Sequence, residues 1–174
     1  MAKRTPNSTL TLPAAAPPSR IRARVLIIEA RYYEKIAEEL IKGAREALDA
    51  VGVAYDRVTV PGALEIPQAL AAAVSAGLIP RNAQAARYDG AIALGCVIRG
   101  ETAHFDVVCN NANHWLMEVA IRHGVPVGNG ILTVENEAQA IARAKGGRNG
   151  KGGEAAQACL RLVELARDLV GQGT

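Results

Sequence analysis

Residues 91–106 have the sequence AIALGCVIRGETAHFD, and the fold prediction starts from the change of character inside this stretch. Its first half is a short apolar run, as expected for a strand buried on both faces. Its second half carries an arginine, two acids, a threonine and a histidine around Gly100. Ligands of parallel α/β folds bind outside the carboxyl ends of the strands. We therefore expect residues 99–106 to form part of a binding site at the end of a core strand.

Apolar runs of strand length also lie on both sides of this stretch, and segments with helical periodicity separate them. The expected strands are residues 24–28, 53–60, 88–97 and 127–134. The expected helices are residues 33–48, 64–76, 106–123, 137–144 and 154–170, with a loop at residues 77–87. Strands that alternate with helices favour right-handed crossovers and a parallel sheet covered on both faces. The predicted fold is an α/β three-layer sandwich with a four-stranded parallel sheet.

The composition limits the possible classes of function. A chain of 174 residues with 49% hydrophobic residues suits one globular domain, expected at residues 21–174. No apolar run approaches the roughly 18 residues of a membrane span, so no membrane partner is expected. The net charge of +3 comes from scattered basic residues, which argues against a nucleic-acid partner.

Compartment and processing are also indicated by the sequence. Three cysteines without metal-type spacing favour a reduced, cytoplasmic setting. Residues 1–20 are rich in Pro, Ala, Ser and Thr and lack the apolar core of a signal peptide, so we expect a flexible extension.

The polar residues after the third strand have two interpretations each. The backbone N–H groups near Gly100 and the Thr102 hydroxyl could hold a phosphate at the start of a helix. Alternatively, Gly100 permits a turn and Thr102 caps the helix, which the local sequence alone favours. His104 could transfer protons near neutral pH, or it could be a packed residue; its place beside Thr102 and Asp106 makes the two interpretations equally weighted.

Other motifs give weaker indications. Glu65 is either a favourable first-turn acid or an acceptor for a polyhydroxylated ligand. Residues 145–153, KGGRNGKGG, lack the hydroxyl residue and preceding strand of a P-loop, so a solvated linker is the expected structure. His104, Asp106 and Cys109 form the only tight cluster of possible metal ligands, which is too few for a zinc site. We therefore predict neither a metal nor a cofactor.

Several blocks together resemble the 6,7-dimethyl-8-ribityllumazine synthase family of riboflavin biosynthesis. The similarity extends from about Arg22 to Leu169. The matching blocks are VPGALEIP at residues 60–67, GCVIRGETAHFDVVCN at residues 95–110, GILTVEN at residues 130–136 with Gln139 and Ala140, and KGG at residues 151–153 with Ala155 and Ala156.

The resemblance implies a flavodoxin-like fold, a homopentamer, and condensation of 5-amino-6-(D-ribitylamino)uracil with 3,4-dihydroxy-2-butanone 4-phosphate. It implies that His104 is the catalytic acid-base group. It also implies that Tyr32 stacks on the pyrimidine and that the ribityl chain is bound by Ala63, Leu64 and Glu65. The uracil edge is expected to bind main-chain groups of Cys96, Val97 and Ile98, and the phosphate is expected to bind Gly100, Glu101 and Thr102. The resemblance further implies that Arg143 and Lys151 come from the adjacent subunit and that Glu154 can orient the histidine.

Two positions depart from the family pattern. Asn129 stands where many members carry an aromatic that covers the ring from the neighbouring subunit, so stacking could be one-sided. Residues 145–150 differ from the pattern usual in members that build sixty-subunit shells, which leaves assembly beyond the pentamer open. Two rivals remain, a non-catalytic carrier of ribityl heterocycles and a shell protein with a vestigial pocket.

Overall fold

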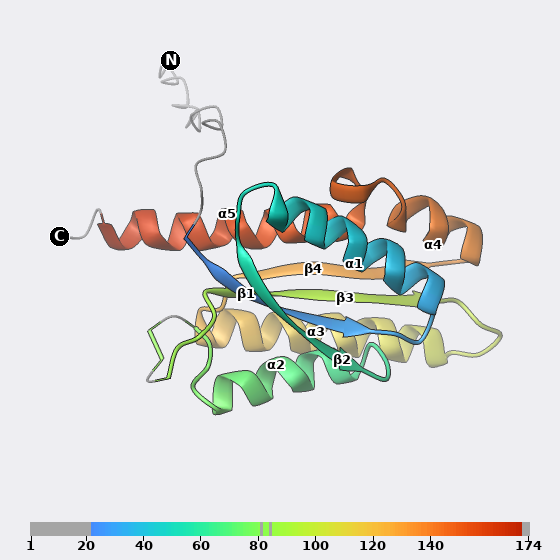
Figure 1. Cartoon of the computed structure of the whole chain (residues 1–174). Coiled ribbons are helices and arrows are strands. Elements are labelled where there is room, and N and C mark those ends of the chain that lie inside the picture. The colour runs from blue at the N-terminus through green and yellow to red at the C-terminus, as the bar shows by residue number, and fades with distance from the viewer. Residues whose placement is uncertain (1–21, 81, 84, 172–174) are drawn as a thin grey trace, which may run out of the picture.

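Four parallel strands form the centre of the molecule (Figure 1). The structure is a computed structural model that describes residues 22–80, 82–83 and 85–171; the predicted extension at residues 1–20 lies outside them. The strands are β1 (Arg24–Ala30), β2 (Ala54–Val60), β3 (Gly90–Ile98) and β4 (Val127–Val134), in the order β2-β1-β3-β4. This order begins like that of flavodoxin, and the predicted four-stranded parallel sheet is confirmed.

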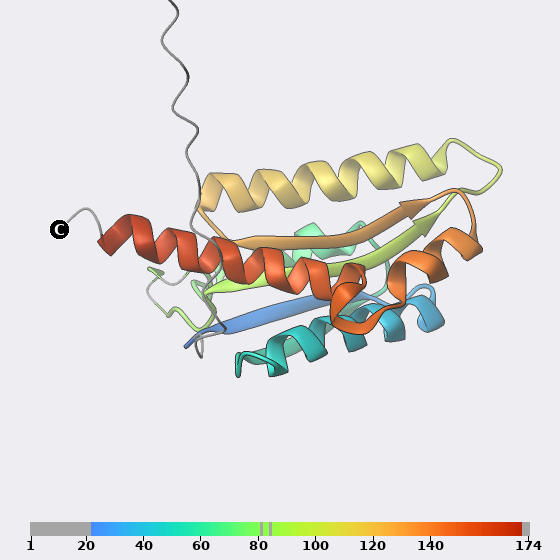
Figure 2. The same ribbon diagram turned by 90° about the horizontal axis from the view of Figure 1, so that it is seen from above.

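Helices cover both faces of the sheet (Figures 1 and 2). One face carries α1 (Glu34–Asp49), α4 (Glu137–Ala144) and α5 (Lys151–Gly171), with a short 3₁₀ turn at Gly147–Asn149, and the other carries α2 (Glu65–Ser75) and α3 (His104–His123). In β1, Val25 and Ile27 pack in the core beneath α1 and α5, whereas Leu26 and Ile28 pack beneath α2 and α3. Burial on both faces explains why the central strands are continuous apolar runs.

Two helices begin earlier than the sequence pattern predicted. α3 begins at His104 rather than at Asp106, and α5 begins at Lys151 rather than at Glu154. The prediction of a solvated linker through residue 153 is therefore wrong for its last three residues, of which Gly152 and Gly153 are buried. The reason is close packing: a Cβ on Gly152 would lie 1.9 Å from the carbonyl oxygen of Leu40 in α1. Glycine there signals contact between helices rather than an exposed loop.

An ionic cluster joins β1 and β2 at the end of the sheet where the strands begin. Arg24 donates to Asp56 through Nε at 3.0 Å and Nη2 at 2.9 Å, and the Tyr88 hydroxyl donates at 2.8 Å. Arg87 adds an ion pair at 3.1 Å. Hydrogen bonds from Arg24 and then Tyr88 lower the pKa of Asp56 from 3.8 to about 2, against a smaller opposing effect of burial.

This lowered pKa predicts a pH dependence of stability. Because the folded-state pKa of Asp56 lies below its ordinary value, the carboxylate stabilises the fold above about pH 4 and loses this effect as pH falls towards 2. Urea unfolding between pH 5 and 2 should therefore show a shallower loss of stability for Asp56→Asn than for the unsubstituted protein. Asp49→Asn, at an exposed position, is the matched control. Parallel curves for Asp56→Asn and the unsubstituted protein would contradict the prediction.

Candidate active site

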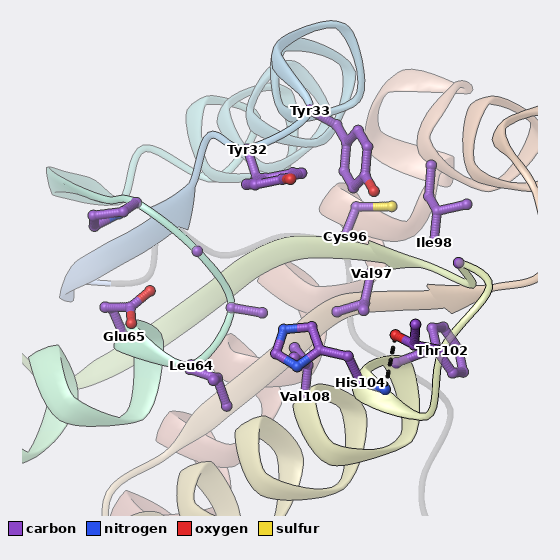
Figure 3. Close-up of a pocket in the computed structure, with 15 residues that line it drawn as sticks. Tyr32, Tyr33, Leu64, Glu65, Cys96, Val97, Ile98, Thr102, His104 and Val108 are labelled. Atoms are coloured by element: carbon purple, nitrogen blue, oxygen red, sulfur yellow. Dashed lines mark hydrogen bonds between the residues drawn. The ribbon is translucent and has the colours of Figure 1, made fainter.

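A cavity of about 410 Å³ lies at the carboxyl ends of β1, β2 and β3 (Figure 3). Strand β2 lies on one side of β1 and β3 lies on the other, so the order of the strands reverses at β1. Ligands of α/β folds bind at such a switch point. Its lining comes from the last residues of β3, from the segments that follow the three strands, and from the beginnings of α2 and α3. The lining residues are Tyr32, Tyr33, Pro61, Gly62, Ala63, Leu64, Glu65, Cys96, Val97, Ile98, Gly100, Thr102, His104, Phe105 and Val108.

The last residues of β3 present an open edge of main chain to this cavity. β1 pairs with β3 as far as Glu29↔Leu94, whereas pairing of β3 with β4 continues to Ile98↔Val134. Within the described residues, the segment Cys96–Ile98 therefore has a strand partner on the β4 side alone. Its backbone donors and acceptors on the β1 side are available to a planar ligand, because each needs a partner when water is displaced.

Two tyrosines after β1 form the wall beside α1. Tyr32 is 73% exposed, and its ring centroid lies 4.9 Å from that of Tyr33 in an edge-to-face arrangement with an interplanar angle of 74°. Burial is the main cause that raises the pKa of the Tyr33 phenol. The exposed face of Tyr32 offers a surface on which a heterocycle can stack.

The connection from β2 to α2 forms another side of the cavity, and this side carries Glu65. The backbone N–H of Glu65 donates to the Gly62 carbonyl at 3.3 Å, which closes the turn that begins α2. Among the described residues, the Glu65 carboxylate has no hydrogen-bond or ion-pair partner. It can accept hydrogen bonds from hydroxyl groups of a ligand, since a carboxylate carries several acceptor sites.

The turn after β3 leads directly to His104 at the start of α3. The backbone N–H of His104 lies 3.4 Å from Thr102 Oγ1, and the imidazole extends into the cavity from the α3 side (Figure 3). The helix has Ala103 as its N-cap residue and therefore lacks a side-chain cap there. The long Thr102 contact only partly supports capping as its role, so the hydroxyl can still donate to a ligand.

Cys96 contributes bulk rather than reactivity to the cavity. Its side chain is 8% exposed, and burial raises the pKa of the thiol to about 11, with the nearby Cys109 as a smaller cause. The thiol therefore stays protonated at neutral pH and is a poor nucleophile.

Comparison with known proteins shows which family the sequence belongs to. The sequence profile of the family described as 6,7-dimethyl-8-ribityllumazine synthase matches residues 22–167. The chain belongs to the 6,7-dimethyl-8-ribityllumazine synthase family. Its activity is that of a lumazine synthase, a transferase of riboflavin biosynthesis.

Individual lumazine synthases are similar over most of the chain. The one from Azorhizobium caulinodans is 54% identical over 145 residues, which are 83% of this chain and 87% of that protein. The one from Agrobacterium fabrum is 48% identical over 150 residues, or 86% and 99% of the two chains. Lumazine synthase 1 from Rhizobium meliloti is 51% identical over 145 residues, or 83% and 92%.

Most residues that the lumazine synthase resemblance indicated line this one cavity. They are His104, Tyr32, Ala63, Leu64, Glu65, Cys96, Val97, Ile98, Gly100 and Thr102. Glu101 lies exposed in the turn between them and does not line it. The chain brings these residues together because their strands end at the same edge of the sheet.

Asn129, Arg143 and Lys151 do not line the cavity of their own chain. Asn129 Nδ2 donates to Asn113 Oδ1 at 2.7 Å, and its own Oδ1 accepts from the Ile131 N–H at 3.0 Å. Arg143 lies in the last turn of α4, and Lys151 forms an ion pair with Glu154 in the first turn of α5. These three residues therefore lie apart from the cavity of the single chain.

Sequence reasoning assigned no role to several residues that line the lumazine synthase cavity. Tyr33 and Phe105 each follow a predicted site residue, and Val108 lies one helical turn after His104. A helix predicted to begin at His104 would have placed Val108 on the same face as the histidine, because residues three to four apart share a helix face. Pro61 and Gly62 were part of a matching block without a role of their own.

Across residues 22–80, 82–83 and 85–171, no group of three or more His, Cys, Asp or Glu side chains is placed to hold a metal ion. In the same part of the chain, every helix is too short or too polar to cross a membrane.

Proposed function

We propose that residues 21–174 form a single lumazine synthase domain and that the cavity is where the two substrates condense. The substrates are 5-amino-6-(D-ribitylamino)uracil and 3,4-dihydroxy-2-butanone 4-phosphate, and phosphate and water are released. The observation that carries this proposal is the open main-chain edge of Cys96–Ile98, which lines the same cavity as the exposed Tyr32. The uracil edge fits a row of alternating backbone donors and acceptors, and its ring face fits the tyrosine.

The remaining contacts follow from the chemistry of the two substrates. The Glu65 carboxylate accepts hydrogen bonds from the ribityl hydroxyls, with Ala63 and Leu64 beneath the chain. Backbone N–H groups of Gly100, Glu101 and Thr102 hold the phosphate of the butanone at the start of α3.

His104 transfers the protons of the reaction. Attack of the uracil amine on the butanone carbonyl gives a carbinolamine, which loses water to form a Schiff base. Phosphate then leaves, and ring closure releases a second water. Each step needs a proton moved at a substrate nitrogen or oxygen, and His104 Nδ1 and Nε2 can both give and accept one. The cavity holds both reactants together, which supplies much of the acceleration.

A homopentamer completes the site in this proposal. Arg143, Lys151 and Asn129 reach the cavity of the adjacent subunit, where the two cations face the phosphate. In the single chain, Arg143 and Lys151 lie on α4 and at the start of α5, on the sheet face opposite α3. Neither residue lines the cavity that contains His104 of the same chain. We place the enzyme in the cytoplasm, where its three free cysteines would stay reduced.

A subunit-mixing experiment tests the shared site. His104→Ala and Arg143→Ala are each expected to be strongly impaired, with lumazine absorbance followed against a protein-free control. When the two variants are unfolded together and refolded at equal amounts, random neighbours pair an intact His104 with an intact Arg143 at about one site in four, giving roughly a quarter of full activity. Separately refolded variants that are mixed afterwards are the control.

The outcomes separate the alternatives. Recovery only after co-refolding supports a site shared by adjacent subunits. No recovery, with each variant impaired on its own, would place both residues in the same site of one chain. Full activity of both variants would contradict the proposed roles. A protein that binds the ribityl heterocycle without accelerating lumazine formation would support the carrier hypothesis instead.

A further inference from the structure

Arg99 connects three elements beside the cavity without lining it. Its backbone N–H donates to the Val134 carbonyl at 2.9 Å, which extends the β3–β4 pairing by one residue. Its side chain donates through Nε to Glu135 at 2.8 Å, after β4. The same guanidinium reaches Asp106 in α3, with Nη1 and Nη2 each 3.4 Å from one carboxylate oxygen.

Arg99 also covers an aromatic ring that lines the cavity. Its Cζ lies 4.1 Å from the centroid of the Phe105 ring, within the range of a cation–π contact. Phe105 is 9% exposed and adjoins His104 in the first turn of α3. One planar group therefore contacts the two residues that follow the histidine in the chain.

The first turn of α3 has few other attachments. Its N-cap residue Ala103 supplies no side-chain hydrogen bond, and the Thr102 contact to the His104 N–H is long at 3.4 Å. The preceding turn includes Gly100, and within the part of the chain that the structure describes no atom lies within 4 Å of a Cβ placed there. The start of this helix therefore depends on contacts made further along its first turn, by Phe105 and Asp106.

The charges around Arg99 indicate that it does not bind the anionic substrate itself. Asp106 and Glu135 bring two negative charges to one guanidinium, and their hydrogen bonds and charges raise the pKa of Arg99, with Asp106 as the largest cause. Both acceptors already occupy its donors in a fork geometry that lysine cannot reproduce. A phosphate would have to displace one of these carboxylates.

We propose that Arg99 is a positioning residue that fixes the first turn of α3 and thereby the direction of the His104 imidazole. This inference rests on the proposed role of His104 in proton transfer. Arg99 acts on the orientation of a group rather than on substrate binding. Its loss should lower kcat and leave KM for both substrates within about threefold, since a misplacement of about 1 Å can cost on the order of 10²-fold.

The test compares Arg99→Met, Arg99→Lys and a matched control. Arg99→Met keeps the apolar stem over Phe105 but removes the fork; we expect kcat to fall between about 10-fold and 100-fold. Arg99→Lys restores one charge and should recover only part of the loss. Arg24→Met is the control, because Arg24 forms a comparable fork with Asp56 at the opposite end of the sheet. The two arginine side chains are also similarly exposed, 41% for Arg24 and 39% for Arg99. Arg24→Met should keep kcat.

Combination with His104→Ala decides whether Arg99 acts through the histidine. If it does, Arg99→Met should change the rate by less than about twofold in the His104→Ala background. The ring signals of His104, assigned by NMR through their loss in His104→Ala, should shift in Arg99→Met while those of His114 and His123 stay in place.

Each possible result supports or overturns the inference. An unchanged kcat in Arg99→Met, an equal loss in Arg24→Met, or a full additional loss on top of His104→Ala would overturn it while leaving the role of His104 intact. Full activity of His104→Ala would overturn the proposed role of the histidine and this inference with it. If Arg99→Met does not fold, as judged by its unfolding temperature, the same comparisons apply to Arg99→Lys.

Discussion

The substitution His104→Ala is expected to slow lumazine formation by tens to thousands of fold, on the order of 10²-fold, without abolishing it. The imidazole enters the cavity from α3, opposite the Tyr32 wall (Figure 3). Its removal takes away a group that exchanges protons near neutral pH. The open edge of Cys96–Ile98 and the Tyr32 ring remain, so both substrates are still held together. The remaining rate should therefore exceed that of the protein-free control.

The control for this prediction is another histidine of the same helix. His114 lies in α3 outside the cavity, where its ring contacts Trp115 edge to face at 5.0 Å. His114→Ala should keep kcat within about twofold, because it removes no group that reaches the substrates. Substrate binding, measured by calorimetry with the ribitylaminouracil alone, should be little changed in His104→Ala. A rate equal to that of the unsubstituted enzyme would exclude His104 as the acid-base group.

The substitution Gly152→Ala is expected to cause a large loss of stability, about 2 kcal/mol or more. A Cβ there would lie 1.9 Å from the Leu40 carbonyl oxygen and 2.7 Å from its carbon. These are backbone atoms of α1, so a rotamer change cannot relieve the clash and the two helices must separate. The gain in helix propensity from glycine to alanine, about 1 kcal/mol, is too small to offset this. Lys151 would move with the helix.

A glycine at the other end of α5 provides the comparison. Gly171 is the last residue of this helix and is exposed, and no atom of the described residues lies within 4 Å of a Cβ placed there. Gly171→Ala should be neutral within about 0.5 kcal/mol, as expected of an exposed position. Calorimetry should show that Gly152→Ala unfolds about 4–8 °C lower than the unsubstituted protein. Equal unfolding temperatures for the two variants would mean that the helices tolerate the extra methyl group.

The sequence alone predicted the sheet and most of the cavity, because both depend on local patterns. The apolar run of β3 and the polar turn after it follow from buried strands and from ligand binding at strand ends. Tyr32, Glu65 and His104 come together because three parallel strands end at one edge. The chemical identity of the substrates came from the resemblance of several blocks, since neither periodicity nor composition encodes it.

Tertiary structure decided features that depend on contacts distant in sequence. The start of α5 differs from the pattern because Gly152 packs on Leu40, more than a hundred residues away. The open edge of Cys96–Ile98 exists because β1 stops pairing before β3 ends, which depends on the register between two strands. A sequence determines which segments become strands and helices, but register and close approach depend on the atoms that meet when those segments pack.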